Sequence, residues 1–136
     1  MLLFAALSAL AGCSHPPPEQ ALRDTIAKMQ AAGESHDVDG LFDPIADDFA
    51  GENGMDRRAF HAYIALMSMR DRNIGTTLGP IDVKMFGDRA TASFTLAIHG
   101  GAGFLPDQAQ VYAVQTGWRL QGNDWKLISA SWKPQL

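Results

Sequence analysis

The chain has 136 residues, of which 46% are hydrophobic and 19% charged, and this length and composition fit one folded domain. Its net charge of -4 disfavours nucleic acid as a partner, because a phosphate backbone is bound by several Lys or Arg placed together. The single cysteine excludes an intrachain disulfide and a thiolate zinc cluster.

The chain begins with a short apolar run. Residues 1–12 carry no charged side chain, and the run is shorter than the roughly 20 apolar residues that a membrane-spanning helix needs. This pattern is typical of the hydrophobic part of a secretory signal peptide. A truncated core helix with a chance cysteine is the alternative, and the absence of Lys and Arg from the run favours it.

The residues around the cysteine extend the signal-peptide interpretation. Leu10-Ala11-Gly12-Cys13 resembles a bacterial lipobox, which implies cleavage after residue 12 and lipidation of Cys13. Residues 13–18 would then form a Pro-rich tether, and residues 19–136 the folded domain. Similarity to Gram-negative lipoproteins implies that Ser14, in place of Asp, directs the chain to the outer membrane. We therefore expect a lipid-anchored protein of the bacterial cell envelope that faces the periplasm.

Helical periodicity follows in the first half of the domain. Apolar residues recur at helical spacing over residues 19–30, which predicts a first helix. A second apolar face runs from Val38 to Phe49, and Pro44 must bend or restart this helix, so we expect it in two pieces. A third helix is predicted over residues 56–70, with Asp56 as its N-cap.

The apolar period then changes to two, which predicts strands. The turn residues Gly87-Asp88 join the first two strands, and Gln121-Gly122-Asn123-Asp124 join the last two. The class is α+β, with N-terminal helices packed on a curved antiparallel sheet of four or more strands. The four strands are expected at residues 81–85, 90–98, 108–120 and 125–132.

This order of elements resembles the nuclear transport factor 2-like superfamily, which has a cystatin-like cone. The motifs that carry the resemblance are Ala46-Asp47-Asp48-Phe49 at the end of the second helix, Gly117-Trp118-Arg119-Leu120 and Asp124-Trp125-Lys126-Leu127. The resemblance implies a conical pocket between the helices and the sheet. Its members include ketosteroid isomerases, scytalone dehydratases and catalytically silent binding or dimerisation modules, so it leaves the function open.

Catalysis in such a cone needs a carboxylate or an imidazole in an apolar wall, beside a hydrogen-bond donor. Asp48 and His61 are the candidate bases, and Tyr112 is the candidate donor. Each base also has a structural interpretation, since Asp48 can accept from backbone amides of the following turn and His61 can lie at the boundary of an apolar helix face. His99 has the opposite parity to Ile98, which predicts that it points away from the pocket.

No metal or cofactor is indicated. The four histidines are scattered, and no His-x-His or His-Glu-x-x-His pair places two ligands on one face. Asp37-Val38-Asp39-Gly40 departs from a calcium loop because its glycine stands at the fourth position and not at the sixth.

Aromatic side chains favour a binding function. Phe94, Tyr112, Trp118 and Trp132 are the candidate lining of a pocket for a small hydrophobic ligand. Strand 108–120 has apolar residues on both faces, so one face of the sheet could form a homodimer. We expect a noncatalytic ligand-binding or protein-interaction module. The alternative is an isomerase, dehydratase or hydrolase of the ketosteroid isomerase-like type.

Overall fold

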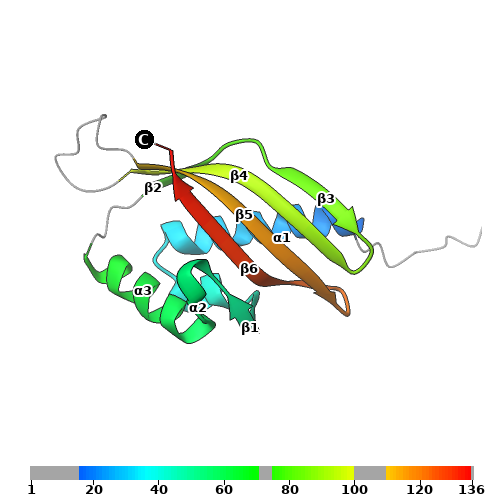
Figure 1. Cartoon of the computed structure of the whole chain (residues 1–136), viewed down its shortest axis with the longest axis horizontal. Coiled ribbons are helices and arrows are strands. Elements are labelled where there is room, and N and C mark those ends of the chain that lie inside the picture. The colour runs from blue at the N-terminus through cyan, green and yellow to red at the C-terminus, as the bar shows by residue number, and fades with distance from the viewer. Residues whose placement is uncertain (1–15, 71–74, 100–109, 136) are drawn as a thin grey trace, which may run out of the picture.

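The computed structural model describes residues 16–70, 75–99 and 110–135, and it has helices packed against one face of a curved sheet (Figure 1). The helices are α1 (Pro18–Glu34), α2 (Val38–Phe42), the 3-10 turn η1 (Glu52–Gly54) and α3 (Arg57–Arg70). The strands are β1 (Ile45–Ala50), β2 (Gly75–Leu78), β3 (Asp82–Phe86), β4 (Arg89–His99), β5 (Gln110–Gln121) and β6 (Asp124–Pro134).

Residues 1–12 and Cys13 lie outside the described residues, so the signal peptide and the lipid site stay predictions. Within the described residues, none of the helices has the length and apolar character required to cross a bilayer.

The two long helices begin where the sequence predicts. Pro18 opens α1, where a missing N–H costs no intrahelical hydrogen bond, and the helix buries Leu22 and Ile26. Asp56 caps α3, because its carboxylate accepts a hydrogen bond from the N–H of Ala59 at 2.8 Å. The predicted cap is therefore confirmed.

The prediction of a helix through Phe49 is wrong. The helix α2 ends at Phe42 and is followed by β1, since Pro44 cannot donate to a continuing helix. Instead the carbonyl of Pro44 accepts a hydrogen bond from the N–H of Leu127 at 2.8 Å and starts a parallel pairing with β6. Ile45 and Phe49 are four residues apart, and this spacing fits one face of a helix and one face of a strand equally well.

The sheet confirms the predicted α+β class and adds two strands to the four expected. Its order is β1-β6-β5-β4-β2, and β3 also pairs with β4. Both predicted hairpins, β3–β4 and β5–β6, are antiparallel. The added strands are β1, which runs parallel to β6, and the short β2, which pairs with the end of β4.

A bulge in β6 keeps one apolar face turned toward the helices. Trp118 pairs with Leu127, whereas the preceding Gly117 pairs with Ser129, so Ile128 is an extra residue in β6. If the same residues paired regularly and no bulge accommodated Ile128, then Ala130 and Trp132 would point to the opposite face. A Cβ at Gly117 would collide with the hydroxyl of Ser129 unless that side chain rotated, so glycine at this position leaves room for Ser129 at the bulge.

A short chain of hydrogen bonds crosses the core. The indole N–H of Trp118 donates to the hydroxyl of Thr116 at 2.7 Å, and this hydroxyl donates to the carbonyl of Ala92, also at 2.7 Å. Thr116 and Trp118 are both almost fully buried, so these bonds satisfy groups that water does not reach. The largest fully buried side chains of the described core are Trp118, Trp125, Phe42 and Leu22.

The opposite face of the sheet is turned to the outside. On β4 and β5 it carries small and polar residues, together with Ala97, Val111 and Ala113. His99 lies on this face beside Thr77, with 3.3 Å between its Nε2 and the Thr77 hydroxyl. The expected homodimer through the sheet stays a prediction.

Replacing Thr116 by Val tests the hydrogen-bond chain. We expect the free energy of unfolding to fall by about 1–3 kcal/mol, because the indole N–H of Trp118 loses its buried acceptor. Chemical denaturation measures the change. Thr91→Val, on the exposed face of β4, is the control and should change stability by less than about 0.5 kcal/mol. Equal losses in the two variants would contradict this account.

Candidate functional site

The inward face of the sheet is divided into two parts by burial. On β4 and β5, most inward side chains toward the turns of the two hairpins are nearly inaccessible, and Ala92 and Trp118 are 0% and 2% exposed. Toward the other end the inward side chains are only half-buried, although they follow the same period-two alternation along the strands. We call this second part the half-buried inner face, and it comprises Phe94, Leu96, Tyr112, Val114 and Trp132.

Three of the four predicted pocket residues thus lie together. Phe94 pairs with Val114, which in turn pairs with Trp132, and Tyr112 pairs with Leu96, so these side chains share one face of three adjacent strands. Trp118, in contrast, belongs to the hydrophobic core. The hydroxyl of Tyr112 donates to the side-chain oxygen of Gln110 at 2.5 Å, on the same face.

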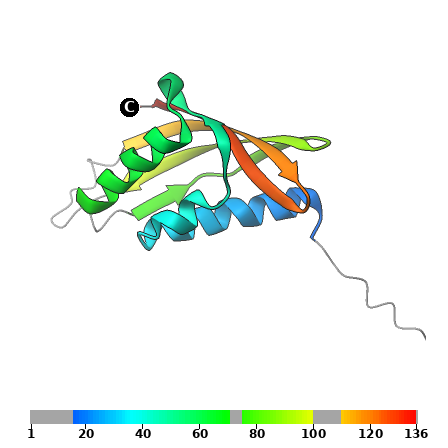
Figure 2. The same cartoon turned by 90° about the horizontal axis from the view of Figure 1, so that it is seen from below.

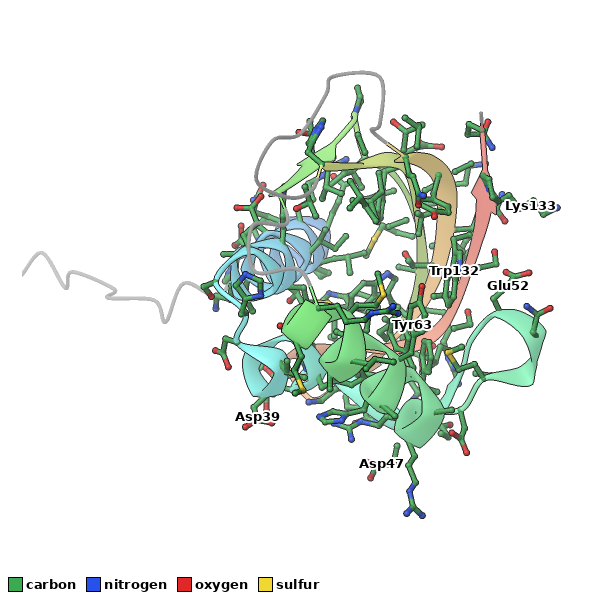
Figure 3. All side chains as sticks on the ribbon, turned by 90° about the vertical axis from the view of Figure 1, so that its left-hand side faces the viewer. Asp39, Asp47, Glu52, Tyr63, Trp132 and Lys133 are labelled. Carbon is green, nitrogen blue, oxygen red and sulfur yellow. The ribbon has the colours of Figure 1, made fainter. Side chains whose placement is uncertain are left out.

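Aromatic residues of the helical layer continue this face. Phe60 of α3 stacks on Trp132 with 5.7 Å between ring centroids, and on Phe49 with 5.3 Å. Tyr63 lies three residues after Phe60 on α3 and is 46% exposed. Figure 3 looks along the molecule from this end, with Tyr63 on α3 and Trp132 on β6, and with the helices and sheet surrounding the enclosed side chains.

Hydrogen bonds on two sides join the sheet to the elements that surround these residues. Glu52 of η1 accepts a hydrogen bond from the backbone N–H of Trp132 at 3.1 Å, beyond the point where β1 pairs with β6. On the other side, Gln30 of α1 donates to the carbonyl of Thr76 at 3.3 Å, and the hydroxyl of Thr76 donates to Glu34 at 3.1 Å. The turn η1 and the helix α1 are therefore tied to the sheet region at this end.

Glu52, Phe60 and Tyr63 are neighbours of this face that were not predicted from the sequence. Phe60 and Tyr63 lie within the predicted helix 56–70, and their spacing of three residues was the available signal. Glu52 gave no such signal, because its contact with Trp132 spans 80 residues of sequence.

Asp48 lies on the outside of the sheet. Its two carboxylate oxygens accept from the two terminal nitrogens of Arg119 at 2.9 and 3.0 Å, in a bidentate ion pair between β1 and β5. This hydrogen-bonded guanidinium holds the pKa of Asp48 below its usual value of 3.8. Asp48 is thus an ionised partner of an arginine on the surface.

His61 also lies outside the cone. Its ring packs edge-on against Phe42, with 4.8 Å between centroids, and it borders an open groove with Asp47, Asp56 and Arg58. The structure therefore does not bring Asp48, His61 and Tyr112 together, because the first two lie at outer grooves and Tyr112 lies on the inner face.

Arg57 separates two solvent-open grooves of about 460 and 410 Å³. Its guanidinium donates to the carbonyl of Ile45 at 3.1 Å and to that of Phe42 at 3.0 Å, and it lies over the Phe42 ring. These bonds give Arg57 a structural role at the junction of α2, β1 and α3.

Within residues 16–70, 75–99 and 110–135 there is no group of three His, Cys, Asp or Glu that could hold a metal ion. Asp37, part of the calcium-loop pattern, caps α2 through the N–H of Gly40 at 3.0 Å.

Comparison with solved structures identifies the fold as nuclear transport factor 2-like, with a cystatin-like cone. A nuclear transport factor 2-like protein from Pseudomonas putida KT2440 is similar with a TM-score of 0.71 and 24% identity, over 85% of this chain and 84% of its own. A Caulobacter vibrioides protein with a cystatin-like fold has a TM-score of 0.73 and 13% identity, over 88% of this chain and 90% of its own. At such identities the likeness shows the fold alone.

Bd1075 of Bdellovibrio bacteriovorus is similar with a TM-score of 0.75 and 13% identity. The match covers 86% of this chain but only 40% of Bd1075. Neither a family model nor a curated protein sequence matches this chain.

Asp48→Asn tests the outer ion pair. The lowered pKa of Asp48 stabilises the fold at pH values above the carboxyl's ordinary pKa, and this contribution is lost as the pH falls through the folded-state pKa. We therefore expect Asp48→Asn to be less stable than the parent at pH 7, with the difference shrinking below about pH 4 and in high salt. Urea denaturation across this pH range measures it.

Asp47→Asn is the matched control, since Asp47 is the exposed neighbour of Asp48. A pH-dependent loss as large in Asp47→Asn as in Asp48→Asn would assign the effect to net charge and would contradict a specific role for the pair with Arg119.

Proposed function

We propose that this protein is a lipid-anchored periplasmic binding module whose cone holds a small apolar, ring-bearing ligand without transforming it. The observation that carries the proposal is the half-buried inner face, where aromatic side chains of β4, β5, β6 and α3 lie together and are incompletely covered. On the described inward positions of β4 and β5, the ionisable groups comprise only the phenol of Tyr112.

The chemistry of this face favours a flat apolar ligand. Phe and Trp side chains gain both from removal of apolar area from water and from offset or edge-to-face ring contacts. The hydroxyl of Tyr112 and the amide of Gln110 add a polar pair at one border of the face. A few polar groups among apolar walls are the usual composition of a small-molecule site.

The enzymatic alternative requires a base beside the bound ligand. Asp48 is engaged by Arg119 on the outer face, and His61 borders an outer groove against Phe42, so neither is placed to abstract a proton from a ligand held on the inner face. These positions favour binding over an isomerase, dehydratase or hydrolase.

The anchor part of the proposal rests on Leu10-Ala11-Gly12-Cys13 and on the prolines that follow. An acylated Cys13 is bound to the membrane through its lipid chains, each buried methylene contributing about 0.8 kcal/mol. The domain would then begin only a few residues from the lipid surface.

Trp132→Ala tests the ligand site with 8-anilinonaphthalene-1-sulfonate as the probe. We expect the fluorescence titration to show roughly three- to tenfold weaker binding, since one aromatic contact contributes about 0.5–1.5 kcal/mol. The control is Lys133→Ala, the exposed next residue of β6, which should bind the probe like the parent. Unchanged binding in Trp132→Ala, with its near-ultraviolet circular dichroism still native, would contradict the site.

Cys13→Ala tests the anchor. Cells that express the full chain and are fed an alkyne fatty acid should incorporate the label into the parent and into Ser14→Ala, because only the Cys13 sulfur and its new amino group would carry the acyl chains. The label should be absent from Cys13→Ala. Incorporation that persists in Cys13→Ala would refute lipidation at this residue.

A further inference from the structure

The described chain begins at one end of the molecule, beside the turns of two hairpins (Figures 1 and 2). The indole N–H of Trp125, at the start of β6, donates to the carbonyl of Pro18 at 2.9 Å. Arg23, in the second turn of α1, donates to the carbonyl of Ile81 at 3.1 Å, just before β3. We call this the hairpin end: the start of α1 and the turns 86–89 and 121–124.

Two large apolar side chains are exposed at the hairpin end. Phe86 is 60% exposed and Met85 is 36% exposed, at the last two positions of β3. The other exposed large apolar side chains of the described residues all lie on α3, toward the opposite end of the molecule. Gly87, with a φ of 66°, turns the chain directly after Phe86, so this side chain stands at the tip of the hairpin.

Charged side chains border this apolar tip. Lys84 and Arg89 are exposed on the same outward face as Phe86, since Phe86 pairs with Arg89 and Lys84 lies two residues earlier on β3. Asp82 and Asp88 are exposed in the same hairpin and balance these two charges. Long cationic side chains beside an exposed aromatic residue suit the boundary between lipid headgroups and acyl chains, where the apolar side chain inserts and the cations stay in the polar layer.

The N-terminal sequence limits how far this end can lie from an anchored Cys13. Three residue steps separate Cys13 from Pro16, which in any conformation span at most about 11 Å. An amphipathic surface element buries its apolar side chains by about 5–10 Å into the same interface. The hairpin end therefore lies within reach of the bilayer, whereas the helix α3 lies toward the far end of the molecule (Figure 2).

We propose that the hairpin end rests on the lipid bilayer, with Phe86 inserted among the headgroups at the tip, Met85 beside it on the opposite face of the hairpin, and Lys84 and Arg89 beside the lipid phosphates. The proposal rests on lipidation of Cys13. It orients the domain so that α3 faces away from the membrane. Because the hairpin has no net charge, apolar insertion holds the contact, and anionic lipid is not required.

The lone native cysteine makes a direct test possible, because lipidation consumes its thiol. The full-length chain with Phe86→Cys is purified with its lipid, labelled with a thiol-reactive environment-sensitive dye and reconstituted into phosphatidylcholine vesicles. Lipids that carry a nitroxide near the headgroup act as the quencher. Met69→Cys is the matched control, since Met69 is 79% exposed near the end of α3 and would carry the same apolar dye.

We expect a blue-shifted dye emission and strong quenching for Phe86→Cys, with neither change for Met69→Cys. Addition of phosphatidylglycerol should leave the difference in place. Equal quenching at the two positions, stronger quenching at position 69, or no quenching at either would overturn the orientation.

The dye stoichiometry separates failure of the anchor from failure of the orientation. An acylated Cys13 leaves one reactive thiol in each variant and none in the parent. Two dyes per variant chain and one per parent chain would refute the anchor. One dye per variant chain with unselective quenching would refute the orientation while the anchor stands.

Discussion

The fold depends on keeping a single apolar face on a sheet that curves around its helices. The bulge in β6 meets this constraint, because the extra residue Ile128 returns Trp132 to the face that already holds Trp125 and Leu127. Gly117 leaves room for the side chain of Ser129 at that point. The core at the hairpin end and the aromatic stacking at the other end therefore share one face, and this face is the one the helices cover.

This shared face is largely buried at one end and half-buried at the other. The buried end forms the core, and the half-buried end is the candidate binding site. At the hairpin end, Leu22 and Ile26 of α1 pack into the same core cluster as Trp118, and even the polar atoms of Thr116 and Trp118 are satisfied internally. Toward the other end, Phe60 covers Trp132 but leaves neighbouring apolar side chains half-exposed. Incomplete cover of an aromatic surface is the condition under which a ligand can supply the missing contacts.

The ionisable groups around β1 lie outside the face that holds the aromatic side chains. The acids of β1 and the basic residues around them lie on the outer surface, where Asp48 binds Arg119 and where Arg57 joins three elements through backbone carbonyls. The pKa of Asp48 is lowered, because its hydrogen bond to the Arg119 guanidinium outweighs the desolvation that would make a buried carboxylate reactive near neutral pH. In the ketosteroid isomerase-like alternative, that desolvation would be the main requirement.

The sequence by itself determined the elements whose signals are local. Helical spacing, together with Pro18 in the first turn of α1 and the N-cap Asp56 of α3, defined the two long helices. Period-two alternation with turn residues defined the hairpins β3–β4 and β5–β6. Only the tertiary structure decided that residues 45–50 form a strand, because their apolar spacing also fits a helix and their partner β6 lies about 80 residues further along the chain. It also decided which inward aromatics are core and which are half-buried: Trp118 and Trp132 obey the same alternation, and they differ only in what the helices place over them.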